Sequence, residues 1–496
     1  MPALLLALAL LVPLHELPWT SFHGDLFAAG ALGLLALKAP PRRWPMSALL
    51  VLALSLVPLV QHAAGLVIYR GDAVMASLYL GGLALAIKVG ADGPGATRTL
   101  AAGVLGAAWI SALIALTQAA GLLSPAAWLG PQHPEGRAVA NLAQPNLLAT
   151  LLSLALVAQL AVWPQGRRWQ APALLAAAAL VAALALTGSR SGLIQALTVL
   201  GVALIFGPRL GLYASRGQVL VLIGTLAAAA VGWGLSQPTG GRGWLHAGSA
   251  VSRWGYARLF VDAVIEAPWA GYGFNQVAVA QSRQLLLGAY PAPWTEHTHN
   301  VVLDLFVWCG LPLGSAMLAL LGWIVLRAMR RAWRDPRLAP AGLGLVVLLV
   351  HAMLEYPLDY FIFLLPFGVL LGRLCDDGAN RQLPALFHGA ACAALASVTL
   401  LVLLDYRKLA AELSVARSGE PLGAATAPAP ALLLDQLRVQ VEIAHYLNGA
   451  PVTHLQPLEA ASRRYAYPAL IQKLSQDASA RGDAALAQRL ARRLGP

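Results

Sequence analysis

The sequence predicts an all-α, polytopic integral membrane protein with about 12–13 transmembrane helices. Hydrophobic residues make up 58% of the chain and charged residues only 11%, and the mean hydropathy is +0.66. Apolar runs long enough to cross a bilayer recur along most of the length. Basic residues gather in alternate loops between these runs, as they do in multi-pass membrane proteins. Together these observations exclude a soluble globular fold.

The apolar runs predict about thirteen spans. In chain order they lie near 3–15, 25–37, 46–61, 73–88, 99–121, 146–163, 171–187, 192–207, 218–235, 300–326, 340–354, 359–373 and 387–404. The first run, Leu4 to Leu14, follows no basic segment and precedes no clear cleavage site, so we expect a spanning helix there and no signal peptide. Cys309, Cys375 and Cys392 are too widely spaced to predict a disulfide framework or a metal site.

Positive charge predicts the orientation of these spans. With the N-terminus inside, the loops on the inner side hold 16 basic residues, whereas the outer loops hold seven arginines and no lysine. The seven are Arg70, Arg137, Arg190, Arg242, Arg253, Arg258 and Arg283. Because cytoplasmic loops carry the excess of Lys and Arg, these seven arginines are predicted to face the outside. The net charge of +12 then reflects topology and does not indicate nucleic-acid binding.

The chain is predicted to divide into two regions. Residues 1–404 form a transmembrane domain with a large outer loop at about 236–299, and residues 405–496 form a helical extramembrane region. A Gly/Pro/Ala linker from Gly419 to Pro430 separates the last span from the helical patterns of this tail. An odd number of spans puts the tail outside. One miscounted span puts it inside, and its eleven basic residues slightly favour the inside.

The segment from Thr295 to Asn300 is the strongest candidate for catalysis. It places two histidines, a glutamate and an asparagine directly before an apolar run. Histidine titrates near physiological pH and can take a proton from a hydroxyl nucleophile. A histidine at a helix start is more often a cap or a surface residue, but two of them beside Asn300, on the side of the arginines, favour catalysis. His299 is the preferred base over His297.

Outer arginines are the candidates for binding an anion. Arg190 lies in a short Gly- and Ser-rich loop between two apolar runs, where a charge is usually kept only if it faces a cavity or a partner. Simple extension to the membrane surface is the alternative. Arg253 and Arg258 stand among aromatic residues, and we favour Arg253, since one of the two could be solvated. The guanidinium fork can bind two diphosphate oxygens at once.

Other polar residues form a second group of candidates. Arg137, Gln144 and Asn146 lead into a span and offer groups for sugar or phosphate, although Asn146 could equally cap the helix after Pro145. His351 and Glu355 lie in a tight turn, where structural pairing is as plausible as substrate contact. No metal is expected, because the outer loops lack Asp-x-Asp and His/Glu clusters. No cofactor is expected, because the inner loops lack nucleotide-binding motifs.

Four motifs in order resemble those of the O-antigen ligase/polymerase superfamily of bacterial inner membranes. They are Gln144-Pro145-Asn146, Gly188-Ser189-Arg190-Ser191-Gly192, His299-Asn300 with Gly310-Leu311-Pro312-Leu313-Gly314, and the stretch from His351 to Leu358. The resemblance covers roughly residues 130–375. The first and last motifs are most similar to the protein O-oligosaccharyltransferase branch, whereas the architecture fits the ligases that join O-antigen to lipid A core.

The resemblance implies a metal-independent glycosyltransferase that uses a glycan on undecaprenyl diphosphate at the periplasmic face of the inner membrane. The acceptor would be a lipid A core sugar or a protein Ser/Thr hydroxyl. We expect His299 to act as base with inversion at the anomeric carbon, Arg190 and Arg253 to bind diphosphate, and Asn300 and Gln144 to orient sugar or acceptor. A polymerase of the same superfamily is the nearest alternative. A transporter or flippase is less favoured, since no internal repeat is visible.

Overall fold

The computed structural model describes residues 1–15, 19–122, 129, 135–236, 248–287, 294–375, 381–418 and 430–494. Within these ranges, only the backbone is described for 248–253 and for 418. Arg242 and residues 419–429 of the predicted linker lie outside the described residues.

The described chain is helical almost throughout, which confirms the all-α prediction. Its strands are two short pairs of residues, β1 (Arg43–Trp44) and β2 (Arg381–Gln382), which pair with each other in antiparallel register. Leucine and alanine dominate the helical runs and favour helix formation. Within a bilayer a helix also satisfies its own backbone hydrogen bonds, which an open strand cannot do.

Among the described residues, thirteen apolar helical segments coincide with the thirteen predicted runs. Eight are long and apolar enough to cross a membrane: Met46–Ala63, Arg70–Ala91, Pro94–Ala119, Arg167–Leu186, Arg190–Leu210, Arg216–Ser236, Val301–Arg334 and Ala385–Arg417. Five are shorter: Pro2–Leu11, Phe22–Ala36, Pro145–Ala161, Ala339–Ala352 and Phe361–Leu374. The chain is therefore a multi-pass membrane protein. Some predicted boundaries are wrong: the first helix ends at Leu11, and the last runs 14 residues beyond 404, to Ser418 as α16 (Ala385–Ser418).

The chain forms two compact units that alternate along the sequence. Unit 1 contains Met1–Leu52, Gly82–His246 and Gly322–Cys392, and unit 2 contains Ala53–Gly81, Ala247–Leu321 and Ala393–Pro496. Helices α3 (Met46–Leu54), α5 (Arg70–Ala91), α13 (Val301–Arg334) and α16 contribute residues to both units. The predicted division at residue 404 into a transmembrane domain and an extramembrane region stays a prediction.

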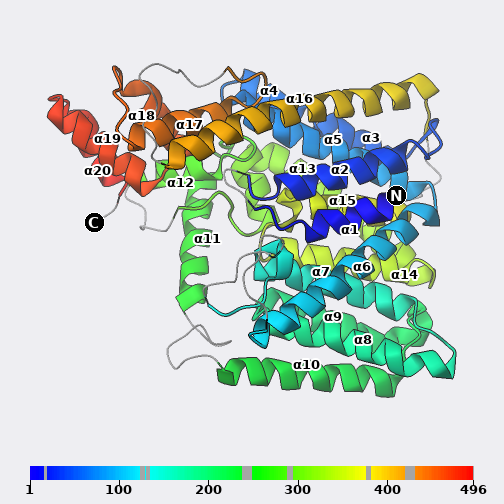
Figure 1. Cartoon of the computed structure of the whole chain (residues 1–496). Helices are drawn as coiled ribbons and strands as arrows, with labels where there is room; N and C mark the ends of the chain where they lie inside the picture. The colour runs from blue at the N-terminus through cyan, green and yellow to red at the C-terminus, as the bar shows by residue number, and fades with distance from the viewer. Residues whose placement is uncertain are drawn as a thin grey trace. The chain divides into compact units, whose positions relative to one another are not determined.

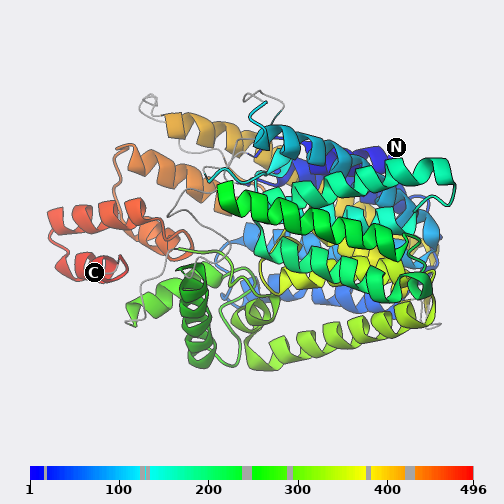
Figure 2. The ribbon, with the colours of Figure 1, turned by 90° about the horizontal axis from the view of Figure 1, so that it is seen from below.

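Unit 1 is a helical bundle. Its other elements are α1 (Pro2–Leu11), α2 (Phe22–Ala36), α6 (Pro94–Ala119), α7 (Pro145–Ala161), α8 (Arg167–Leu186), α9 (Arg190–Phe206), α10 (Arg216–Ser236), α14 (Ala339–Ala352), α15 (Phe361–Leu374) and the 3-10 turns η1 (Ala140–Leu142), η2 (Gly207–Leu210) and η3 (Pro357–Asp359). Helix α7 is buried over most of its length and contacts α6, α8, α9 and α14. Both ribbon views show α8, α9 and α10 side by side (Figures 1 and 2).

Helices α5 and α15 approach each other closely within unit 1. A Cβ on Gly90 would lie 2.1 Å from the Val369 carbonyl oxygen, and one on Gly372 would lie 2.0 Å from the Ile87 oxygen. Only glycine therefore allows this contact.

Lys88, on helix α5, is one of the basic residues predicted for the inner loops. Its ammonium group is buried and lies 2.5 Å from the Asp92 carboxylate. Lys88 therefore forms an ion pair inside the protein.

Unit 2 combines a loop region with the C-terminal helices. It contains α4 (Val57–Ala63), α11 (Gly248–Glu266), α12 (Val277–Leu286), α17 (Asp435–Leu447), α18 (Gln456–Arg464), α19 (Pro468–Ala480) and α20 (Ala484–Arg492). Helix α12 contacts α18 and α20. In both ribbon views the C-terminal helices, coloured orange to red, form one cluster (Figures 1 and 2). A buried apolar cluster around Phe260, Val307 and Trp308 joins α11 to α13.

Helix α13 is broken at Gly310, which adopts φ 67°. A Cβ at this position would lie 2.7 Å from the Pro268 carbonyl oxygen, and the same oxygen accepts a hydrogen bond from the Leu311 amide at 2.6 Å. A Cβ added to Gly271 would likewise lie only 2.6 Å from the backbone nitrogen of Gly310. The loop that follows α11 therefore packs directly on the break in α13.

Candidate active site

The segment Thr295–Asn300 in unit 2 is a loop held by its own side chains. The Thr295 hydroxyl donates to the His297 carbonyl oxygen at 2.8 Å, and the Thr298 hydroxyl donates to the Asn300 carbonyl oxygen at 3.0 Å. The Thr298 amide donates to the Asp304 carboxylate at 3.0 Å. These bonds replace those of regular secondary structure and hold the loop against the start of α13.

His299 occupies an unusual backbone conformation in this loop. Its φ is +62°, in the left-handed region that non-glycine residues rarely adopt. Such conformations cost about 1–3 kcal/mol and gather at functional sites. The side chain is half-buried, and its ring centroid lies 6.4 Å from that of Tyr256 on α11. The loop therefore presents His299 beside an aromatic ring at the cost of local strain.

The other predicted residues of unit 2 have more ordinary surroundings. The Asn300 carboxamide oxygen accepts from the amides of Val302 at 3.0 Å and Leu303 at 3.2 Å, so Asn300 caps α13. His297 is half-buried, and Arg258 is exposed on α11. Arg253 also belongs to α11, but its side chain lies outside the described atoms.

In unit 1, two of the predicted motifs and the candidate residue Arg137 meet at Asn146. Its carboxamide oxygen accepts from the Ser189 hydroxyl at 2.7 Å and lies 3.5 Å from the Arg137 guanidinium. Arg137 also donates to the Thr187 carbonyl oxygen at 2.8 Å. The Ser189 oxygen accepts from the Gly192 amide at 3.0 Å and so caps α9. Asn146 is therefore bonded across to the loop and does not cap its own helix.

The glycines of the Arg190 loop allow close packing. A Cβ on Gly188, where φ is +58°, would lie 2.4 Å from the Trp233 ring, and one on Gly192 would lie 2.4 Å from the Ala149 side chain. The small residues of this loop thus allow α10 and α7 to pack closely against it. Arg190 is the first residue of α9 and is half-buried.

Gln144 follows a strained turn in unit 1. Ala140 and Ala143 have φ of 45° and 56°, both in the left-handed region. The Gln144 side-chain oxygen is buried and has no hydrogen-bond partner among the described residues. An unpaired buried acceptor is costly, so this oxygen is suited to receive a donor from a bound molecule.

His351 and Glu355 are both buried within unit 1. The His351 ring nitrogen Nδ1 lies 2.6 Å from the Thr150 hydroxyl oxygen, which also donates to Gln195 at 3.2 Å. Only 1% of the His351 surface and 7% of the Glu355 surface are exposed. This geometry favours the structural alternative for His351, which links α14 to α7.

Unit 2 contains an ion network around the buried Arg464 that the sequence does not predict. Arg464, from α18, lies 3.0 Å from the Asp72 carboxylate and 3.2 Å from that of Glu296. Burial alone would lower its pKa, but the two carboxylates hold the pKa of Arg464 well above its ordinary value. Glu296 is three residues before His299, so a tail residue reaches the candidate catalytic loop. No pattern could indicate a pair 392 residues apart.

Further contacts hold the C-terminal tail within unit 2. The Asp435 carboxylate accepts from the amides of Arg70 at 3.2 Å and Gly71 at 2.7 Å, at the start of α5. Arg493 lies 3.4 Å from the Ser282 hydroxyl on α12. The tail therefore packs against the start of α5 and against α12, within the unit that carries His299. The side of the membrane on which the tail lies stays a prediction.

Comparison with known proteins places the chain in a family. The O-antigen ligase family model matches residues 175–318, and the model of the C-terminal part of virulence factor membrane-bound polymerases matches residues 341–494. A general O-oligosaccharyltransferase of Acinetobacter baylyi is 31% identical over 421 residues, which cover 77% of this chain and 71% of that protein. The chain belongs to the O-antigen ligase superfamily.

A second relative in this superfamily is the ComP-specific O-oligosaccharyltransferase of Acinetobacter baylyi, 31% identical over 125 residues, or 25% of this chain and 22% of that protein. Arg190 and His299 fall within the ligase match, and His351 and Arg464 fall within the polymerase match. These similarities support a glycan ligase that acts as a membrane glycosyltransferase. They confirm the resemblance inferred from the four motifs.

Proposed function

We propose that this member of the O-antigen ligase superfamily is a protein O-oligosaccharyltransferase. It moves a preassembled glycan from undecaprenyl diphosphate to a Ser or Thr hydroxyl of a protein at the periplasmic face of the bacterial inner membrane. The observation that carries the proposal is the similarity to a general O-oligosaccharyltransferase over 77% of the chain. The excess of basic residues in the opposite loops supports the periplasmic side.

His299 takes the proton of the acceptor hydroxyl as its oxygen attacks the anomeric carbon. The new carbon–oxygen bond forms as the bond from that carbon to the diphosphate oxygen breaks, and the diphosphate leaves with the electron pair. Displacement in one step inverts the anomeric configuration. The strained backbone and half-buried ring of His299 support this role.

Arg190 and Arg253 bind the charge of the leaving diphosphate, as a metal ion does in other transferases. In the described part of the chain, no three His, Cys, Asp or Glu side chains come together as a metal site requires. Gln144 is better supported as a sugar ligand than Asn300. The Gln144 side-chain oxygen lacks a partner among the described residues, whereas the Asn300 oxygen caps α13. Arg137, Asn146, Arg258, His297 and Asn300 are proposed to shape the substrate site. His351 and Glu355 act on it through neighbouring side chains.

The closest alternatives change only the acceptor. A ligase would use a lipid A core sugar, and a polymerase would use a growing lipid-linked glycan. The match to the C-terminal part of membrane-bound polymerases favours the polymerase as the second candidate.

Glycosylation in a deletion strain separates these possibilities. We expect loss of glycan from one or more periplasmic proteins, with unchanged lipopolysaccharide and unchanged glycan length, and restoration by the wild-type gene but not by His299→Ala. Loss of O-antigen from lipid A core, or glycans stopped at one repeat unit, would overturn the protein acceptor.

A further inference from the structure

A cavity lined by arginines lies in unit 1, at the C-terminal end of α13. Its volume is about 370 Å³, which is within the range of small-molecule sites. Its walls consist of Ser47, Trp323, Ile324, Arg327, Arg330, Arg331, Arg334, Leu374 and Cys375. None of these residues belongs to the candidate active site.

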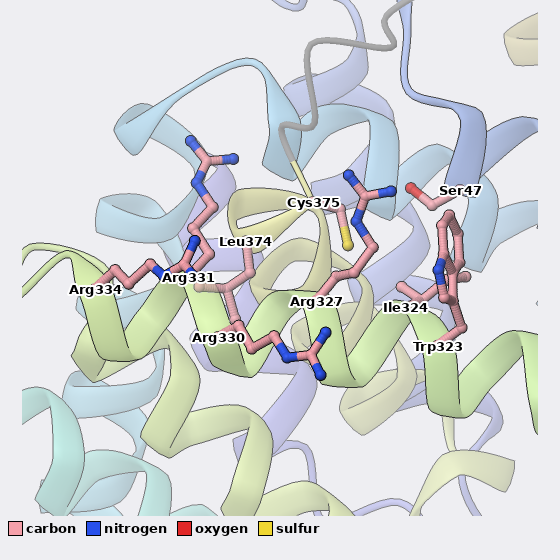
Figure 3. A pocket seen from close by; sticks show the side chains of 9 residues that line it. All are labelled: Ser47, Trp323, Ile324, Arg327, Arg330, Arg331, Arg334, Leu374 and Cys375. Atoms are coloured by element: carbon pink, nitrogen blue, oxygen red, sulfur yellow. The ribbon is translucent and has the colours of Figure 1, made fainter.

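The arginines form one face of α13. The spacing of Arg327, Arg331 and Arg334 places them on the same side of the helix. Figure 3 shows Arg327 and Arg331 extending from α13 on the side of Leu374 and Cys375, with Arg334 reaching toward Arg331. Three of the four lining arginines are exposed, and Arg331 is half-buried. Such a face is suited to bind phosphate oxygens.

Ser47 gives a second and independent indication of a ligand. It lines the cavity from the first turn of α3, and only 2% of its surface is exposed. Its hydroxyl has no hydrogen-bond partner among the described residues. A buried hydroxyl without a partner is costly, and a bound phosphate or glycerol oxygen would supply one.

The remaining walls indicate an amphiphile. Trp323, Ile324 and Leu374 offer apolar surface beside the arginines. Trp323 and Trp333 are 44% and 46% exposed on a helix apolar enough to cross the membrane, and tryptophan is enriched at the membrane–water interface. Arg327 lies 4.8 Å from the Trp323 ring centroid. The cavity thus combines charge with apolar surface at the depth of lipid headgroups.

We propose that this cavity binds the phosphate headgroup of an anionic phospholipid from the surrounding membrane. The positive-inside distribution explains why arginines end α13. It does not require a cavity, or a buried serine whose hydroxyl has no partner among the described residues. Asp376 and Asp377 follow Cys375 in the sequence. Even if both neutralised an arginine, four guanidiniums against two carboxylates would leave two positive charges for the lipid.

Native mass spectrometry of the full chain tests the proposal. The protein is reconstituted with equal phosphatidylglycerol and phosphatidylcholine, and retained lipids are counted. We expect wild type to retain phosphatidylglycerol selectively, and the triple variant Arg327→Gln/Arg331→Gln/Arg334→Gln to bind it about ten- to a hundredfold more weakly. Ser47→Ala should weaken retention less. The triple lysine variant keeps the topology charges and should retain an intermediate amount.

A matched control removes the same charge elsewhere. Arg167, Arg168 and Arg216 are exposed, belong to unit 1 and to the same set of inner loops, and do not line the cavity. Their triple glutamine variant should retain phosphatidylglycerol like wild type. Equal losses in both triple variants, or equal retention of both lipids by wild type, would overturn the proposal. Displacement of phosphatidylglycerol by excess inorganic phosphate would show a site for free phosphate and would also overturn it.

Discussion

The candidate residues of unit 1 and those of unit 2 are stabilised by networks of different range. In unit 1, Asn146 joins Arg137 and Ser189, all within a stretch of about fifty residues. In unit 2, the loop that carries His299 contains Glu296, which is bound by an arginine from the far C-terminal region. The network in unit 1 is built from residues that lie in or beside the motifs. The second makes the candidate catalytic loop depend on a region that contains none of the motifs.

The largest effect is expected from removal of the proposed general base, His299. His299→Ala should lower glycan transfer by about 10²–10⁴-fold, because the proton acceptor is removed while the fold is retained. The measurement is transfer from lipid-linked donor by purified protein at matched expression. His297→Ala should lose less, and His454→Ala, an exposed histidine of the tail, should behave like wild type. Near-normal transfer by well-folded His299→Ala would remove His299 from the mechanism.

Breaking the long-range network should destabilise the protein strongly. Arg464→Met leaves the buried Asp72 carboxylate without its counter-ion, which typically costs about 3–5 kcal/mol. Glu296→Gln should cost at most about 1 kcal/mol, because the Glu296 side chain is 40% exposed.

The thermal unfolding midpoint measures both changes, with Lys473→Met as control for a half-exposed ion pair within one helix. If Arg464→Met and Lys473→Met unfold at the same temperature, the network does not hold the tail to the loop.

The proposed binding of diphosphate by Arg190 and Arg253 depends on the shape of the guanidinium group as well as on its charge. Arg190→Lys and Arg253→Lys should each lose about tenfold or more in transfer and bind donor more weakly, because an ammonium lacks the planar fork. Arg283→Lys is the control, since Arg283 is exposed and pairs with Glu266 at 2.8 Å, a contact that lysine can keep. Wild-type donor affinity and rate in all three variants would contradict the clamp.

The short-range network should yield a smaller loss of stability. Ser189→Ala removes the cap of α9 and a hydrogen bond to Asn146, and capping residues contribute about 0.5–2 kcal/mol. Thr198→Ala, at a half-buried site on the same helix where the side chain caps nothing, should leave the midpoint almost unchanged. Equal midpoints for both variants would mean that Ser189 does not stabilise this region.

Removal of divalent cations should have the smallest effect. If arginines meet the charge of the leaving group, purified enzyme should transfer glycan at an unchanged rate in excess EDTA, with lipid-linked donor and no nucleotide. Activity that disappears in EDTA and returns with Mg²⁺ or Mn²⁺ would replace the arginine clamp by a metal.

Spans and motifs were predictable because they depend on neighbouring residues. A run such as Pro94–Ala119 is apolar over its whole length, and any such run must form a helix in a bilayer. The motifs around Asn146, Arg190 and His299 were visible as polar stretches beside apolar runs. The family resemblance drawn from them is confirmed by the comparisons.

Partners of buried polar groups were not predictable, because they depend on packing between distant segments. The sequence by itself determined an all-α membrane protein, its apolar runs, the uneven distribution of its positive charge and the stretches that carry candidate chemistry. Only the tertiary structure decided the left-handed backbone of His299, the bond from Ser189 to Asn146, the pairing of Arg464 with Asp72 and Glu296, and the contacts of the tail with α5 and α12. Hydrophobicity is set by composition within one segment, whereas a buried charge is stabilised by whichever opposite charge the fold brings within reach.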